Sequence, residues 1–362
     1  MVSAAQNKKG RFLPKEFDLS HFLCFTIHDA MVQIIVSGES SNIFTTTIKF
    51  ETVDEKNSFE NSNDIFEWLD SIQRYKDRAR ILRTIVFPAV LSDMMHCVFE
   101  CLECSRKGKL AVSYMLIRKP LQESLYLLEK ILLDELDFAA KLATDPLQLR
   151  PHTAGGIEGH TKRIQSVLEL LGEAYLLDAN YIAQLRYDKN NYDSFDGICN
   201  HAMHLFTQHK AIQTEKLNIN FIFSGAEEKL LQWAFLYSRL PYLLYYTHRI
   251  VEHITGRIAL TTQEYIDDID RRISAQLLLW WNNLDESDKC AQLATFIEKT
   301  RIRLNEQCQN SGYHMPNVKD LKRMASGGAY PGESMSNVRQ RDQNRKKVIK
   351  LTRNKMNSKL DR

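Results

Sequence analysis

Four polar side chains stand at helical spacing between residues 192 and 209. Asp193, Asp196, Asn200 and His204 follow one another at steps of three, four and four residues, so they would share one face of a helix. A carboxylate beside an imidazole can orient the ring for base catalysis, and the same groups can hold a divalent metal. As a catalytic set, His204 would be the general base, Asp196 its orienter or a metal ligand, and Asn200 a substrate contact. The alternative is a polar face that is solvated or purely structural.

Three cysteines form a second candidate. Cys97, Cys101 and Cys104 make a CxxxCxxC pattern, a spacing found in iron–sulfur enzymes in which three thiolates hold the cluster. Such ligand loops follow a strand, whereas this pattern lies in a stretch that reads as a helix. Residues at i, i+4 and i+7 share a helix face, and free thiols commonly pack there as small apolar groups. We therefore interpret the three as core cysteines and expect neither a metal nor a cofactor.

Basic residues are concentrated at the C-terminal end. Arg339–Arg362 contains ten Lys or Arg and two Asp or Glu, although the whole chain has a net charge of only +3. No aromatic residue lies among them to stack on a base, so we predict contact with phosphates of RNA or DNA, or with an acidic protein. The alternative is a tail that only aids solubility. The residues expected to bind nucleic acid are Arg345, Lys346, Lys347, Lys350, Arg353 and Lys355.

Helices must position most of these groups. From residue 64 onward, apolar residues recur every three or four positions, and Asp64 with Glu67 resembles a capping box at a helix start. Pro120 predicts that a helix begins or kinks there. Residues 145–160, with two Pro and three Gly, predict an exposed loop. Further helices are expected over Thr161–Tyr187, Tyr192–His209, Ala226–Ile254, Thr262–Trp281 and Ser287–Gln309.

The N-terminal residues differ in composition. Met31–Val36 and Ile43–Phe50 are rich in apolar and β-branched residues on either side of a turn-forming sequence, which predicts a small β-hairpin. The expected organisation is a β-containing segment over residues 1–63, a helical bundle domain over 64–311, and a flexible linker with a disordered basic tail over 312–362. The fold class is thus mainly α, a multi-helix bundle with a small β element.

Composition also bears on the compartment. The longest apolar stretch, Leu230–Tyr246, contains Gln232, Arg239 and Pro241 and is shorter than a bilayer span, so we expect no membrane association. No secretory signal is recognisable, and seven cysteines, an odd number, favour free thiols in a reducing compartment. We therefore expect a cytoplasmic protein.

Three passages resemble a known family. They are Leu116–Leu121 with Glu123, the patch Asn200–His204, and Trp233–Tyr246. Through these three passages, the stretch from Ala111 to Ile254 resembles uncharacterised bacterial helical proteins related to the HEPN group. The resemblance implies a helical scaffold, a homodimer, and a role in antiviral defence or a toxin–antitoxin system, where many members are metal-independent ribonucleases.

The family's catalytic signature is not carried over. HEPN ribonucleases use an Arg followed, after four to six residues, by His, and no Arg in this chain has a His at that distance. We therefore predict a helical binding protein that contacts nucleic acid or an acidic partner through its basic tail. The alternative is a ribonuclease or other phosphodiester-cleaving toxin that uses the face around His204.

Overall fold

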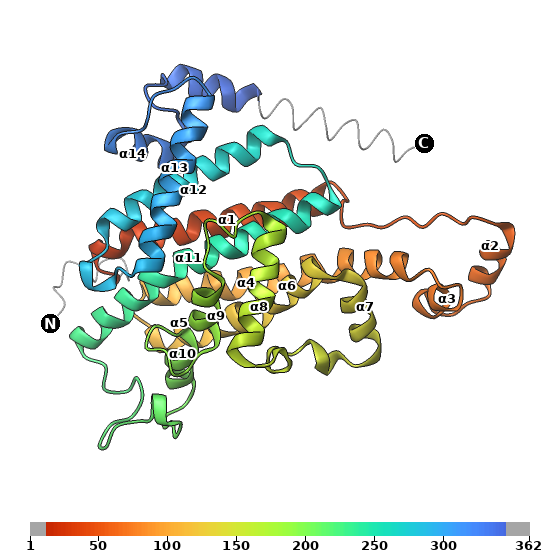
Figure 1. Ribbon diagram of the computed structural model, residues 1–362, viewed down its shortest axis with the longest axis horizontal. Helices are drawn as coiled ribbons and strands as arrows, with labels where there is room; N and C mark the ends of the chain where they lie inside the picture. The colour runs from red at the N-terminus through yellow and green to blue at the C-terminus, as the bar shows by residue number, and fades with distance from the viewer. Residues whose placement is uncertain (1–11, 345–362) are drawn as a thin grey trace.

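The computed structural model describes residues 12–344, and within that range the chain forms fourteen α-helices and no strand (Figure 1). The helices are α1 (Asp18–Ser40), α2 (Val53–Glu60), α3 (Ile65–Ser71), α4 (Tyr75–Arg106), α5 (Leu110–Lys119), α6 (Leu125–Leu133), α7 (Glu135–Thr144), α8 (Gly156–Leu171), α9 (Ala179–Tyr187), α10 (Phe195–Met203), α11 (Ala226–Ile258), α12 (Gln263–Asn283), α13 (Ala291–Asn310) and α14 (Val318–Gly327). The expected mainly α class is confirmed.

The predicted N-terminal hairpin is wrong. Met31–Val36 lies inside α1, and Ile43–Phe50 has no regular secondary structure. The apolar residues of α1 recur at steps of four, as Leu23, Ile27, Met31 and Ile35, and all are buried in the main core. That helical period, which begins well before Met31, outweighs the local β-branched composition.

Helix α11 runs through the middle of the bundle (Figure 1). It contacts α1, α5, α6 and α8, and nearly every residue from Leu236 to Thr247 is buried. A helix that is apolar on all sides must be surrounded by protein, which explains its central position. The helix continues through Pro241 without a break.

Pro120 interrupts the path from α5 to α6. Helix α5 ends at Lys119, a π-helical turn (η3) covers Pro120–Ser124, and α6 begins at Leu125. Proline lacks the amide hydrogen and its ring crowds the preceding turn, so the wider π turn accommodates it. The predicted irregularity at Pro120 is confirmed. The turn presents Gln122 and Glu123 to the site described below.

Residues 312–336, expected to form a flexible linker, instead contain packed structure. Helix α14 contacts α12, and Leu321 and Met324 are buried. Arg341, within the basic segment, donates hydrogen bonds to Glu333 at 2.8 Å and to Asp268 at 3.3 Å. The six predicted nucleic-acid-binding residues, from Arg345 to Lys355, lie outside the described residues.

Two smaller departures concern loops and helix ends. The expected helix over Thr161–Tyr187 is divided into α8 and α9, because Gly172 (φ 69°) ends α8 in the left-handed conformation. The loop 145–160 holds two short 3-10 turns, and its last residues begin α8. A separate apolar cluster around Trp68, Leu69 and Ile81 holds α2 and α3 at one end of the molecule (Figure 1).

Among residues 12–344, two helices are long and apolar enough to cross a membrane by length and composition. They cover Lys15–Ser40 and Tyr75–Arg106, and 44% and 39% of their most apolar windows are buried inside the protein. Core helices of soluble proteins and signal sequences have the same property. The expectations of no membrane association and of a cytoplasmic location therefore stay predictions.

Candidate functional site

The four polar residues predicted to share one helix face do not all lie on one helix in the structure. Helix α10 covers only Phe195–Met203, so Asp193 precedes it and His204 follows it as an extended C-cap residue. Asp193 accepts hydrogen bonds from Arg239 Nε at 2.6 Å and from the Tyr181 hydroxyl at 2.8 Å. These contacts bind the start of α10 to α9 and α11, a structural role.

His204 lies on the surface. Its imidazole is exposed, and the described residues give the ring no hydrogen bond. Its main chain is held instead, because the carbonyl accepts a hydrogen bond from Asn220 at 2.8 Å. The geometry therefore does not place a carboxylate against His204.

Asp196 and Asn200 do meet, one turn apart on α10. Asp196 Oδ1 accepts hydrogen bonds from Asn200 Nδ2 at 2.9 Å and from Gln122 Nε2 at 2.8 Å. Both residues are buried, and Lys189 Nζ lies 3.8 Å from Asp196 Oδ2. Two elements that carry the family resemblance, the turn after Pro120 and α10, are thus joined at one point.

That point forms one wall of a cleft of about 810 Å³, which is a size typical of ligand sites. The cleft lies between the Pro120 turn, the loop 145–157, the start of α8, and the end of α9. Its lining contains three permanently cationic side chains and two carboxylates, so the fixed charges have a positive excess. Its charged or titratable lining residues include Arg118, Glu123, Arg150, His152, Lys189 and Asp196.

The start of α8 adds to this positive potential. Gly155 and Gly156 have φ values of 86° and 70°, conformations that L side chains adopt at a cost. They allow the loop to turn sharply into α8, so that Gly156 and Ile157 line the cleft. The first amides of a helix lack intrahelical acceptors and carry the positive end of its dipole. A phosphate or carboxylate group is the ligand that such an end favours.

A network of buried charged residues lies next to the cleft. Glu129 is fully buried and accepts hydrogen bonds from Arg163 Nε at 2.9 Å, from Arg186 Nη1, and from the Tyr246 hydroxyl at 2.8 Å. Burial alone would raise the pKa of Glu129, but the two guanidinium groups hold it below its usual value. One carboxylate faces two guanidinium groups, which leaves one buried positive charge in excess.

His160 connects this network to the cleft. Its ring stacks on Tyr187 with centroids 3.6 Å apart. Burial, together with Arg163 and Arg186, lowers the pKa of His160 to about 3. The ring is therefore neutral at physiological pH.

A second cleft, of about 320 Å³, lies on the other side of the same loop. It is lined by Lys130, Lys141 and Arg163 together with Gln148, Thr153 and Gly159, and none of its lining residues is acidic. Arg163 Nη2 is buried there without a hydrogen-bond partner among the described residues. An unsatisfied buried guanidinium hydrogen is costly, and an anion in this cleft would satisfy it.

Of the three cysteines on α4 that were interpreted as core residues, Cys101 is buried, whereas Cys97 and Cys104 are only partly buried. Cys101 is fully buried, its Sγ lies 3.1 Å from the Ser113 hydroxyl, and burial raises its pKa to about 12. Burial also raises the pKa of Cys97 and of Cys104, which are only partly exposed.

Sequence patterns did not identify the network. Glu129, Arg163 and Arg186 come from α6, α8 and α9, and no spacing rule links residues so far apart. One signal was available: Arg186 follows the apolar residues Ile182, Ala183 and Leu185, and a cation that becomes buried beside such residues requires a carboxylate partner.

Comparisons with protein-family models, with curated proteins and with solved structures found no match. The likeness to the HEPN group therefore stays an expectation.

Proposed function

We propose that this protein binds a phosphate-bearing ligand, with nucleic acid as the favoured class, across the two basic clefts beside loop 145–159. Two observations support this proposal. One loop lines two cationic clefts, and the buried network of Glu129, Arg163 and Arg186 next to them contains one more positive than negative charge. A polymer with regularly spaced phosphates can occupy both clefts at once, whereas a single small anion can fill only one.

The proposal keeps a role for the basic C-terminal residues. Arg345, Lys346, Lys347, Lys350, Arg353 and Lys355 would add phosphate contacts that carry no base specificity. The clefts contain few aromatic side chains for stacking, so backbone contact rather than base readout is expected there too. An acidic protein is the competing partner class, which a wild-type protein that binds neither RNA nor DNA would favour.

The test measures binding of a labelled single-stranded RNA by fluorescence anisotropy at several salt concentrations. The double variant Arg150→Glu/Lys189→Glu should weaken binding and lower the slope of log affinity against log salt by about 0.7 for each phosphate that is no longer neutralised. Lys322→Glu, an exposed change on α14, is the matched control and should leave the slope unchanged.

Deletion of residues 345–362 completes the design. A further weakening of binding that is additive with the cleft variant would assign phosphate contacts to both regions. If the wild-type protein binds no RNA or DNA, or if the cleft variant binds as tightly as Lys322→Glu, the proposed cleft function is wrong.

No contact among the described residues favours phosphodiester cleavage, because His204 is exposed and its ring forms no hydrogen bond with a carboxylate. Homodimer formation and a role in antiviral defence or a toxin system likewise stay predictions from the resemblance. Exposed apolar residues in the loop between α10 and α11, including Phe206, Leu217 and Phe223, are compatible with a second copy as partner.

A further inference from the structure

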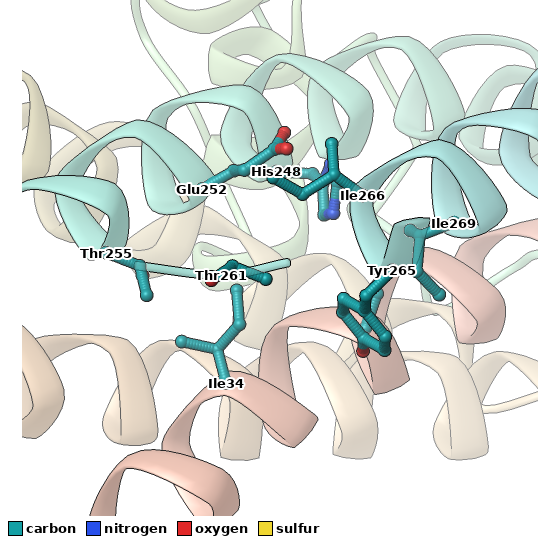
Figure 2. A pocket seen from close by; sticks show the side chains of 9 residues that line it. Ile34, His248, Glu252, Thr255, Thr261, Tyr265, Ile266 and Ile269 are labelled. Atoms are coloured by element: carbon teal, nitrogen blue, oxygen red, sulfur yellow. The ribbon is translucent and has the colours of Figure 1, made fainter. Parts of the chain in front are cut away.

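A small pocket lies between α1, α11 and α12 (Figure 2) and shares no lining residue with the two clefts. Its volume is about 30 Å³, which is room for a water molecule or a single ion. Ala30, Ile34, Ile266 and Ile269 supply apolar walls. His248 and Glu252 supply polar groups, and Figure 2 shows them as neighbours on α11.

His248 has an unmet hydrogen-bonding atom. The residue is 4% exposed, and its Nδ1 is buried without a hydrogen-bond partner among the described residues. Buried polar atoms in native proteins nearly always have a partner, so this ring nitrogen calls for a water molecule or an ion in the pocket that His248 lines. Imidazole nitrogen is among the commonest metal ligands in proteins.

Two carboxylates lie beside this ring. Glu252 follows His248 by four residues and therefore shares its face of α11, while Asp270 comes from α12. One ligand atom from each of His248, Glu252 and Asp270 lies within 4.8 Å of the other two. Within the described residues no other group of His, Cys, Asp or Glu meets that condition.

Neighbouring charges leave room for a cation. Arg249 pairs with Glu173 at 2.6 Å, with Glu252, and with Asp270 at 3.3 Å, and Arg303 pairs with Glu173 at 3.3 Å. When Glu252 is ionised, three carboxylates face two guanidinium groups, a net charge of −1; burial raises the pKa of Glu252 to about 7. Arg249 engages only one oxygen of Glu252, Oε2, so the other remains available to an ion.

We propose that His248, Glu252 and Asp270 form a divalent transition-metal site, best suited to Zn²⁺, that joins α11 to α12. One imidazole and two carboxylates are a ligand set that Zn²⁺ accepts, and three protein ligands leave a fourth position open. Bond lengths of about 2.0–2.2 Å place tetrahedral ligands roughly 3.3–3.5 Å apart, so ligand atoms that lie within 4.8 Å of one another need to close by at most about 1.5 Å.

The experiment titrates Zn²⁺ into the full-length protein after chelator treatment and desalting, with isothermal calorimetry and native mass spectrometry as readouts. Wild-type protein should bind one Zn²⁺ per chain at this site, and Glu252→Gln and Asp270→Asn should each weaken binding by about 10-fold or more. Glu264→Gln, at the exposed start of α12, and His253→Gln, one turn along α11, are the matched controls and should bind like wild type.

Two further measurements keep the test decisive. His248→Gln should abolish binding, and circular dichroism shows whether the variant is folded; if it is not, the two carboxylate variants decide the question. Co²⁺ loaded in place of Zn²⁺ should give a visible spectrum without the intense thiolate charge-transfer bands. Those bands would place the ion on cysteines instead, and they would overturn the proposal, as would an absence of Zn²⁺ binding or equal affinity in all variants.

Discussion

Arg163 Nη1 lies 2.7 Å from His160 Nδ1. A guanidinium group can only donate, so Nδ1 must accept, and the ring's single proton lies on Nε2. The same Arg163 donates from Nε to Glu129. One side chain therefore sets both the tautomer of the histidine in the first cleft and the ionisation of the buried carboxylate.

His160 makes stability depend on acidity. Its pKa falls from 6.5 to about 3 on folding, so between these values the unfolded chain binds a proton that the folded chain does not. The free energy of unfolding should therefore decrease as pH falls below about 6.5. His160→Gln, which keeps an acceptor for Arg163, should lose less stability than wild type between about pH 7 and pH 5 in urea titrations.

His152→Gln is the control for that experiment, because it removes an exposed histidine from the same loop. A His160→Gln protein whose loss of stability on acidification equals that of wild type would show that this ring does not stay neutral in the folded state.

Glu129 should be among the least replaceable side chains. Glu129→Ala leaves Arg163 and Arg186 buried with no carboxylate, which should destabilise the protein by about 3–5 kcal/mol. Asp93→Ala removes a half-exposed pair with Lys119 and should cost less than about 1 kcal/mol. Chemical denaturation measures both, and similar losses for the two variants would contradict the role assigned to the network.

Gly156 tests the turn into α8. At φ 70°, an alanine meets no atom within 4 Å but adopts a strained backbone, so Gly156→Ala should cost about 1–2 kcal/mol. Gly256→Ala lies in α11, where φ is ordinary and the space is also open, and it should be neutral or stabilising by up to about 1 kcal/mol. If thermal denaturation finds equal effects at the two positions, the left-handed turn is not required.

His204→Ala addresses the predicted catalytic set. Because the ring is exposed and unattached, the variant should fold and bind RNA like wild type, and RNA incubated with either protein should be cleaved to the same extent. Selective loss of cleavage in the variant, detected on denaturing gels, would restore His204 as a catalytic residue despite its position.

Local sequence patterns predicted α11 and α12 closely but missed α1. The expected helix over Ala226–Ile254 is α11, Thr262–Trp281 is α12, and Asp64 caps α3 through hydrogen bonds to Phe66 and Glu67. Caps, prolines and apolar periods act within a few residues, so they can be recognised in the sequence. The hairpin prediction failed because a short β-branched stretch is compatible with a buried helix as well as with a strand.

The sequence by itself determined a helical protein, its main helices and the separation of basic residues toward one end. Only the tertiary structure decided which polar residues meet. Asp193 and His204 were expected beside Asp196. Instead, Asp193 pairs with Arg239, and His204 is exposed to solvent. Glu129 with Arg163 and Arg186, and His248 with Asp270, come together from different helices, because burial of apolar faces sets how helices pack and charged groups must then find partners across the interfaces.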